Sequence, residues 1–291
     1  MLSVKKALEN KYDEIDLCVS MLVLYHHTNI KVEAGHFYSI ENDCDADDVK
    51  VFPIQKFAFE FYDSLENKAS TKLFSVESIV NGKRKFVVAN FNSFLKIYLK
   101  SNYNKRHAYE IVRDNFPCRL YFDIEYSIPL NPDIDGNKLL ISWIEILEWH
   151  VYEYLGISLS NQNIVDLDSS TEEKFSHHII VILCDPGCFQ SEYLFVNNRH
   201  VGDFVTIVLR SIGQLNHGEV ANISNDRRPQ PQPTSPNFWL RAGDDKVSCF
   251  VDRSVYSKNR AFRIFMSSKF SKCVVMKVSP RNENGYNTIL R

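Results

Sequence analysis

The segment from Cys118 to Tyr126 sets two acidic residues within an otherwise apolar strand, and it constrains the fold more than any other part of the chain. Side chains on a strand alternate between two faces, so Asp123 and Glu125 share one face, and Phe122 and Ile124 share the other. Like charges on one face repel, and burying them is costly unless a cation lies between them. The usual cation is a divalent metal ion bound by oxygen ligands. The alternative is a pair of solvated acids on an edge strand.

The composition is that of a soluble globular protein, with 44% hydrophobic and 24% charged residues among 291. No apolar run approaches the length of a membrane-spanning helix, and the N-terminus lacks the apolar segment of a secretory signal. The seven cysteines contain no Cys-x-x-Cys pair. Scattered cysteines of this kind are typical of reduced thiols. We therefore expect an intracellular protein that does not contact a membrane.

The charge of the chain is unevenly distributed. Residues 246–291 contain ten Lys or Arg and two acidic residues, a net charge of +8, so residues 1–245 carry −10 of the total of −2. A basic segment on a nearly neutral chain favours binding of a polyanion such as nucleic acid or a nucleotide. A solvated charged face explains the same pattern equally well.

Segments with strand and helix patterns follow one another in mixed order. Apolar and β-branched residues predict strands over 73–80, 85–89, 174–183, 247–252 and 261–265, with an Asn81-Gly82 turn between the first two. Apolar residues at helical spacing predict helices over 1–30, 90–100, 138–155 and 201–212. This order favours an α+β fold with helices packed on a mixed sheet.

A second group of polar residues opens the apolar strand at 174–183. Lys174, Ser176 and His178 lie on one face of that strand by the period of two. They offer an ammonium group, a hydroxyl group and imidazole N–H groups, which together suit a chain of phosphates. The alternative is a polar strand end exposed to solvent, and for His178 alone this alternative is the better explanation.

A third group follows the strand at 247–252. Asp252 adds a carboxylate, and a dense series of cations follows it, with Arg260 and Arg263 among them. The planar guanidinium group matches phosphate oxygens. Three carboxylates could bridge two metal ions about 4 Å apart for phosphoryl transfer, and the cations would neutralise a departing pyrophosphate. The chain has no Gly-x-x-x-x-Gly-Lys-Ser/Thr loop, which argues against a P-loop ATPase.

The order of these motifs resembles that of the archaeo-eukaryotic primase superfamily: Asp-x-Glu, then Ser-x-His, then a lone Asp after an apolar strand. The chain is especially similar to the eukaryotic primase-polymerase (PrimPol) family, over about 73–278. Five segments carry the resemblance: 118–125, 167–178, 200–204, 251–263 and 267–269. Together these motifs are highly specific, although each one alone is weak.

The resemblance implies the catalytic core of this superfamily. That core has two mixed α/β modules, the second RRM-like, with the active site in the cleft between them. For this chain we expect an N-terminal helical region over 1–50, an N-terminal α/β module over 51–115 and a catalytic module over 116–291. We expect a mobile insertion at about 214–246, because this part contains a Pro-rich stretch.

The resemblance also implies roles for individual residues. By matching positions, Asp123, Glu125 and Asp252 are catalytic and hold two Mg²⁺ or Mn²⁺ ions. The nucleotide-binding residues are Lys174, Ser176, His178, Arg260, Arg263, Lys269 and Tyr109, the last near the incoming sugar, and Arg84 contacts the template strand. The family's C-terminal zinc segment and the acidic tail that binds replication protein A have no counterpart here, so we expect no zinc.

The implied activity is that of a nucleotidyltransferase. Such a DNA primase and DNA polymerase would bind a single-stranded DNA template and primer, use dNTPs or alternatively NTPs, and extend the primer or join the first nucleotides. The resemblance implies work in replication restart or damage tolerance, by repriming and translesion synthesis, in the nucleus and the mitochondrion. Two alternatives remain: a catalytically silent single-stranded DNA-binding module that kept the fold, and a two-metal nuclease. The intact carboxylates argue against the first, and the Lys174, Ser176 and His178 group argues against the second.

Overall fold

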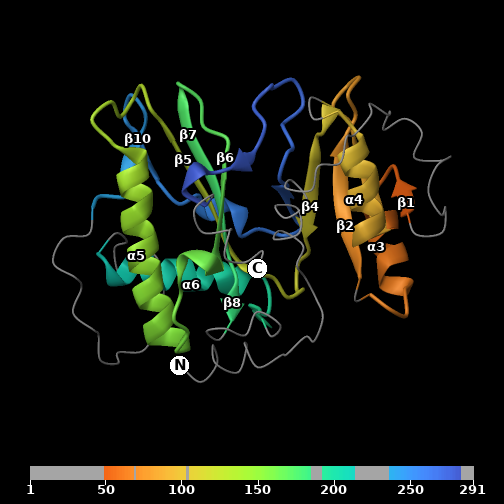
Figure 1. The fold of residues 1–291 in the computed structure, drawn as a ribbon, viewed down its shortest axis with the longest axis horizontal. Helices are drawn as coiled ribbons and strands as arrows, with labels where there is room; N and C mark the ends of the chain where they lie inside the picture. The colour runs from red at the N-terminus through yellow and green to blue at the C-terminus, as the bar shows by residue number, and fades with distance from the viewer. Residues whose placement is uncertain (1–48, 69, 103–104, 185–191, 214–235, 283–291) are drawn as a thin grey trace. The chain divides into compact units, whose positions relative to one another are not determined.

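The structure is a computed structural model that describes residues 49–68, 70–102, 105–184, 192–213 and 236–282 (Figure 1). These residues form two compact units. The first, the carboxylate unit, comprises 114–166 and 170–258. The second, the five-stranded unit, comprises the described residues of 49–113, the short segment 167–169 and residues 259–282. The chain thus enters the five-stranded unit three times, which departs from the contiguous catalytic module expected over 116–291.

The carboxylate unit is built on three strands. They are β5 (Leu120–Ser127), β6 (Ile164–Asp168) and β7 (Lys174–Val181). Strand β7 lies between the other two and runs antiparallel to β5. Two small hairpins, β8 (Leu183–Cys184) with β9 (Glu192–Tyr193) and β10 (Trp239–Gly243) with β11 (Lys246–Cys249), complete the strands of this unit.

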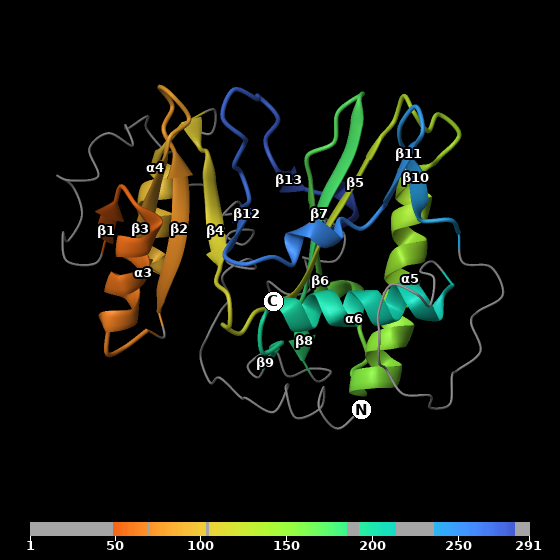
Figure 2. The same cartoon turned by 180° about the vertical axis from the view of Figure 1, so that it is seen from behind.

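Two long helices pack on these strands, and they run in clearly different directions (Figure 2). Helix α5 (Gly136–Leu155) begins after Asp135, whose side chain accepts hydrogen bonds from two backbone N–H groups of the first turn. It ends at Gly156, which adopts the left-handed conformation (φ 73°) that glycine tolerates best. Helix α6 (Asn198–Ser211) is capped in the same way by Asn197. The predicted helices over 138–155 and 201–212 are therefore confirmed.

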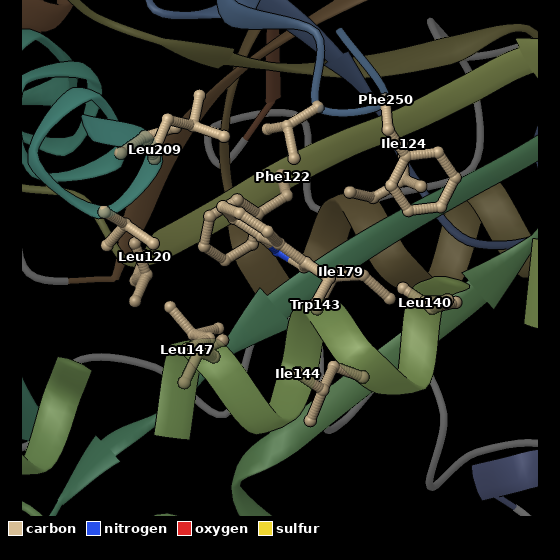
Figure 3. Packing of buried hydrophobic residues seen from close by; sticks show 14 of the residues in the cluster. Leu120, Phe122, Ile124, Leu140, Trp143, Ile144, Leu147, Ile179, Leu209 and Phe250 are labelled. Carbon is tan, nitrogen blue, oxygen red and sulfur yellow. The ribbon is translucent and has the colours of Figure 1, made fainter. Parts of the chain in front are cut away.

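The core of the carboxylate unit forms between β5, β7 and the two helices (Figure 3). Phe122 of β5 contacts Trp143 of α5 edge to face, with their ring centroids 5.5 Å apart. Both side chains are fully buried, as is Leu147 one turn further along α5. The apolar face of β5 therefore points into the core, as its alternation predicted, and the face with the acids points away from the core.

The five-stranded unit contains a sheet in the order β1-β3-β2-β4-β12. Its strands are β1 (Val49–Phe52), β2 (Thr71–Glu77), β3 (Arg84–Asn90), β4 (Ala108–Val112) and β12 (Arg260–Arg263), all antiparallel to their neighbours. The turn between β2 and β3 contains Gly82 at φ 68°, which confirms the predicted hairpin.

One helix packs on each face of this sheet. Helix α3 (Gln55–Ser64) packs Ala58 against Leu73 and Val88. Helix α4 (Phe91–Lys100) packs Phe94 onto Phe74, with the rings stacked 3.7 Å apart. Helix α4 confirms the helix predicted over 90–100. A short strand, β13 (Lys277–Val278), pairs with the last two residues of β6, which also belong to this unit.

One sequence-based boundary needs correction, and other predicted segments lie outside the described residues. The insertion expected at about 214–246 extends too far, because residues 236–246 are described and contain β10 and the start of β11. Phe238 explains the difference, since its fully buried side chain packs 5.5 Å from Trp143. The helix predicted over 1–30 and residues 214–235 lie outside the described residues.

The described residues contain both helices and strands, and the helices pack on largely antiparallel sheets. This arrangement agrees with the predicted α+β fold. Among the described residues, no helix is both long and apolar enough to cross a bilayer.

Candidate active site

Strand β5 carries the first two candidate acids on the face opposite the core. Its antiparallel register with β7 sets Asp123 opposite His178 and Glu125 opposite Ser176. Two positions further along, Lys174 lies opposite Ser127. Residues directly opposite each other in a sheet share a face. The fold therefore gathers the Asp-x-Glu and Lys-x-Ser-x-His groups on one surface of two neighbouring strands.

The third acid approaches β5 from its other edge. Val251 forms an antiparallel bridge with Ile124, and the N–H of Glu125 donates to the carbonyl oxygen of Phe250 at 3.1 Å. The N–H of Asp252 then donates to the carbonyl oxygen of Asp123 at 2.8 Å. The backbones of all three acids thus lie next to one another, although Asp252 is far from the other two in the sequence.

Each acid has polar contacts of its own. The Lys174 ammonium group forms an ion pair with Glu125, and Nε2 of His178 lies 3.8 Å from Oδ1 of Asp123. The Asp252 carboxylate accepts from the N–H and the hydroxyl of Ser254, each at 2.9 Å. The Asp123 side chain is 15% exposed and that of Glu125 is 36% exposed, so both remain accessible to a small ligand.

The carboxylate donors are of the kind that Mg²⁺ and Mn²⁺ prefer. Within the part of the chain that the structure describes, no group of three or more His, Cys, Asp or Glu residues is arranged so that it could hold a metal ion. The contacts explain why: Glu125 is directed to Lys174, and Asp252 to Ser254. The donor types suit a divalent cation, but the side chains of the described acids are not arranged to hold one in this structure.

Two tyrosines join β5 to the turn that follows Asp252, and they were missed by the sequence reasoning. The Tyr256 hydroxyl donates to the carbonyl oxygen of Tyr121 at 2.8 Å, and the Tyr121 hydroxyl donates to that of Val255 at 3.1 Å. Burial raises the pKa of Tyr256 well above its usual value, and the nearby charges of Tyr121, Asp123 and Asp252 add to the effect. The signal was available, because Tyr121 lies two positions before Asp123 on the same strand face.

The loop before β7 orients the phosphate-binding candidates. The hydroxyl of Ser170 accepts from the N–H of Ser176 at 3.0 Å, and the hydroxyl of Thr171 accepts from the N–H of Lys174 at 3.1 Å. The N–H of Thr171 donates to the carbonyl oxygen of Lys174 at 2.8 Å. This loop is acidic and rich in hydroxyl groups, but its role could not be predicted because it lacks any ligand-like spacing.

The two neighbouring histidines of β7 have different surroundings. His177 points to the other face of the strand, where its Nδ1 lies 2.6 Å from Oδ1 of Asp166 and its ring stacks on Phe175. His177 and Asp166 are almost completely buried. This pair is part of the interior of the unit, and His178 is the histidine beside the acids.

The remaining candidates belong to the five-stranded unit, where Tyr109 and Arg263 lie directly opposite each other on β4 and β12. Arg263 donates to the hydroxyl of Ser169 at 2.8 Å. Arg260 is three positions away from Arg263 on the same strand, so it points to the opposite face. Lys269 lies in the loop after β12, next to Ser268, whose N–H donates to the carbonyl oxygen of Arg106 at 2.9 Å.

Arg84 lies at the start of β3, close to Tyr109. Its guanidinium carbon is 4.9 Å from the centre of the Tyr109 ring, and it forms two hydrogen bonds with Glu77. The structure thus brings together three candidates in this unit, Arg84, Tyr109 and Arg263, through neighbouring strands. Glu77 is a further residue of this group that the sequence reasoning missed.

Comparison with known proteins supplies an independent line of argument. No family model matches the chain. The curated mouse protein named DNA-directed primase/polymerase protein is 31% identical over 260 residues, and the human protein of the same name is 30% identical over 279 residues. A cow protein with this name is 31% identical over 279 residues.

These matches cover 80% of this chain, and 47 to 48% of each of those three relatives. The chain therefore spans about half the length of the curated relatives that it matches. The similarity agrees with the resemblance that the motifs carry. Over the matched region, the chain is similar to curated proteins named DNA-directed primase/polymerase protein.

Proposed function

We propose that this protein is a nucleotidyltransferase that copies a DNA template, either by extending a primer or by joining the first nucleotides. The observation that carries the proposal is the backbone hydrogen bond between Asp252 and Asp123, because it brings the third acid of the family pattern beside the other two. The similarity to DNA-directed primase/polymerase proteins supports the same activity.

In this proposal, Asp123, Glu125 and Asp252 bind two Mg²⁺ or Mn²⁺ ions. Such ions, when bound, would activate the attacking hydroxyl group and stabilise charge on the leaving oxygen. The three carboxylates would supply the negative charge that holds these ions beside the α-phosphate. In the reaction, the primer 3′-hydroxyl group loses its proton to water and its oxygen bonds to the α-phosphorus, the bond from that phosphorus to the oxygen that bridges it to the β-phosphorus breaks, and pyrophosphate leaves.

Residues of β7 would bind the triphosphate. Lys174, Ser176 and His178 share a face with the acids, and each can donate a hydrogen bond to a phosphate oxygen. Lys174 pairs with Glu125 in the present structure. A nucleotide would therefore exchange this ion pair for one between Lys174 and phosphate, and so release Glu125 for metal binding.

The five-stranded unit would supply the other nucleotide contacts. The proposal assigns triphosphate binding to Arg260, Arg263 and Lys269, contact with the incoming sugar to Tyr109, and contact with the template strand to Arg84. It follows the family pattern in which both modules act on one nucleotide. A photo-crosslinking dNTP should therefore label peptides from both units, and labelling of the carboxylate unit alone would contradict this part of the proposal.

The proposal is tested by extension of a labelled primer on a DNA template with dNTPs and Mg²⁺ or Mn²⁺. We expect extension by the wild type, none by an Asp123→Asn/Glu125→Gln variant, and full extension by Asp203→Asn, a control that removes an exposed acid from α6. Equal extension by the wild type and the double variant would refute the proposed active site.

The same assay separates the alternatives. Degradation of the labelled DNA without dNTPs, dependent on the same acids, would indicate a two-metal nuclease. Tight binding of single-stranded DNA, unaffected by divalent metal and without turnover, would indicate a silent binding module.

We further propose that the protein acts in replication restart or damage tolerance. An enzyme that starts strands on single-stranded DNA can resume synthesis beyond a blocked position. Two templates test this role: one without a primer, and one with an abasic site ahead of the primer. Synthesis on neither template would limit the protein to ordinary extension. Cell fractionation would test the nuclear and mitochondrial location.

A further inference from the structure

The carboxylate of Glu77, at the end of β2, joins several candidate residues of the five-stranded unit. Its Oε2 accepts from the hydroxyl of Tyr109 and from the N–H of Phe270, both at 3.0 Å. Its Oε1 accepts from Nε and from a terminal nitrogen of Arg84, at 3.2 and 3.1 Å. The side chain of Glu77 is only 12% exposed. We call Glu77, Arg84, Tyr109 and Phe270 the Glu77 cluster.

Within this cluster, the Tyr109 ring is fixed at two places. Its hydroxyl group is held by Glu77, and the Arg84 guanidinium group lies over its face at 4.9 Å from the ring centre. Burial raises the pKa of Tyr109 to about 12, and the charge and hydrogen bond of Glu77 add to this shift. Tyr109 therefore stays neutral at physiological pH and keeps its proton for the hydrogen bond to Glu77.

The cluster also fixes the loop that carries Lys269. On one side of Lys269, the N–H of Ser268 donates to the carbonyl oxygen of Arg106 at 2.9 Å. On the other side, Phe270 donates its N–H to Glu77. The ring of Phe270 packs against Gly82, where an added Cβ would lie 2.6 Å from the ring. The backbone of Lys269 is therefore anchored at both neighbouring positions.

We propose that Glu77 is a positioning residue that fixes Tyr109, Arg84 and the Lys269 loop relative to one another, and thereby sets the preference for dNTPs over NTPs. This inference rests on the proposed function, which assigns Tyr109 to the incoming sugar. A ring with its hydroxyl bonded and its face covered cannot swing aside, so it excludes a 2′-hydroxyl group by contact. A loosened ring would yield to that group. Glu77 acts only through its neighbours.

The experiment measures steady-state incorporation of a dNTP and of the matching NTP by Glu77→Gln, Tyr109→Phe and the combined variant. Glutamine keeps the shape of Glu77 but has one acceptor oxygen in place of two. We expect Glu77→Gln to raise KM for the dNTP about two- to tenfold, the range of one ordinary hydrogen bond, with kcat changed less than about twofold. The preference for dNTP over NTP should fall by a similar factor.

The combined variant should be no worse than the more affected single variant, because both substitutions remove the same restraint. Glu77→Asp, which retains the charge, should restore part of the preference. The matched control is Asp63→Asn, because Asp63 also forms a two-bond pair with an arginine, Arg113, that lies over aromatic rings in the same unit. This control should leave the preference unchanged.

The possible outcomes separate the inference from the function on which it rests. If the wild type extends primers and Glu77→Gln behaves like Asp63→Asn, the inference fails and the proposed function stands. Strictly additive effects in the combined variant would also overturn it. If the wild type extends no primer under any condition, both fail together. Melting temperatures identify any variant that fails to fold, and Glu77→Asp then decides the question.

Discussion

The N–H of Asp252 donates a 2.8 Å hydrogen bond to the carbonyl oxygen of Asp123. This contact joins two candidate acids through their backbones and leaves both carboxylates out of the bond. The bridge between Val251 and Ile124, one position away, fixes the same register from the core side. The position of each acid therefore depends on main-chain pairing and on buried apolar residues, so either carboxylate can be replaced without disturbing the strand that carries it.

Replacement of Asp252 by Asn should abolish DNA synthesis while the protein stays folded. We expect activity to fall more than about 100-fold, since loss of a group that merely orients a metal ligand already costs roughly 10- to 100-fold. Asparagine can still accept from the N–H of Ser254, so the local turn should survive. Primer extension and thermal melting measure the two effects. Retained activity, or a loss matched by unfolding, would contradict the assignment.

Replacement of Lys174 by Met should weaken nucleotide binding. A hydrogen bond to a charged group contributes about 1.5–3 kcal/mol, so we expect KM for dNTPs to rise roughly 10- to 150-fold. The partner, Glu125, is 36% exposed, so its loss of an ion pair should change stability little. Lys138→Met is the matched control, because Lys138 forms an exposed ion pair with Asp135. An unchanged KM in Lys174→Met would remove Lys174 from the triphosphate site.

The sequence pattern predicted those parts of the site that local periodicity determines. The period of two assigned Asp123 and Glu125 to one face of β5, and the core contacts of Phe122 and Ile124 confirm that assignment. The helix predicted over 138–155 likewise ends at the expected place, because Gly156 directly after it adopts the left-handed backbone that favours glycine at a helix end.

Long-range pairing could not be predicted in this way. Nothing local to Asp252 indicates which strand lies beside it, because Phe250 and Val251 pair with residues of β5, such as Ile124, that lie far away in the sequence. Glu77 was missed for a related reason, since a lone acid at a strand end has no spacing signal until Tyr109 and Phe270 converge on it.

The core of the carboxylate unit should be sensitive to truncation of Leu147, which is fully buried between α5 and the sheet. We expect Leu147→Ala to lower the free energy of unfolding by about 2–5 kcal/mol, because it leaves a cavity as well as removing apolar contacts. Ile141→Ala on the same helix should cost about 0.5 kcal/mol or less, because Ile141 is 44% exposed. Denaturant unfolding would measure both, and equal losses would contradict the described core.

Stability should fall in mild acid because of His150. Burial lowers the pKa of His150 below its usual value of about 6.5, and its Nδ1 donates to the carbonyl oxygen of Ile146 at 2.7 Å. Below a pH of about 6.5 the unfolded chain takes up a proton that the folded chain binds less readily. The contribution of His150 to the free energy of unfolding is therefore complete above that pH and is lost as the pH falls.

Urea unfolding of wild type and His150→Gln between pH 5 and 8 would measure this effect. In the variant, the free energy of unfolding should change less with pH over the acidic half of that range. His200→Gln, which removes an exposed histidine from the start of α6, is the control and should follow the wild type. Identical slopes for wild type and His150→Gln would show that His150 does not titrate differently in the folded state.

Binding of single-stranded DNA should depend on salt through the end of the β2–β3 turn and the start of β3, where Lys83, Arg84 and Lys85 are all exposed. Each cation that neutralises a phosphate should add about 0.7 to the slope of log affinity against log salt concentration, because it releases condensed counterions. Arg84→Ala should therefore reduce that slope by about 0.7 and weaken binding about equally for all template sequences. Fluorescence anisotropy over a salt series measures this, with Lys138→Ala as the control. An unchanged slope would mean that Arg84 contacts no phosphate and that its role is confined to its contacts with Glu77 and Tyr109.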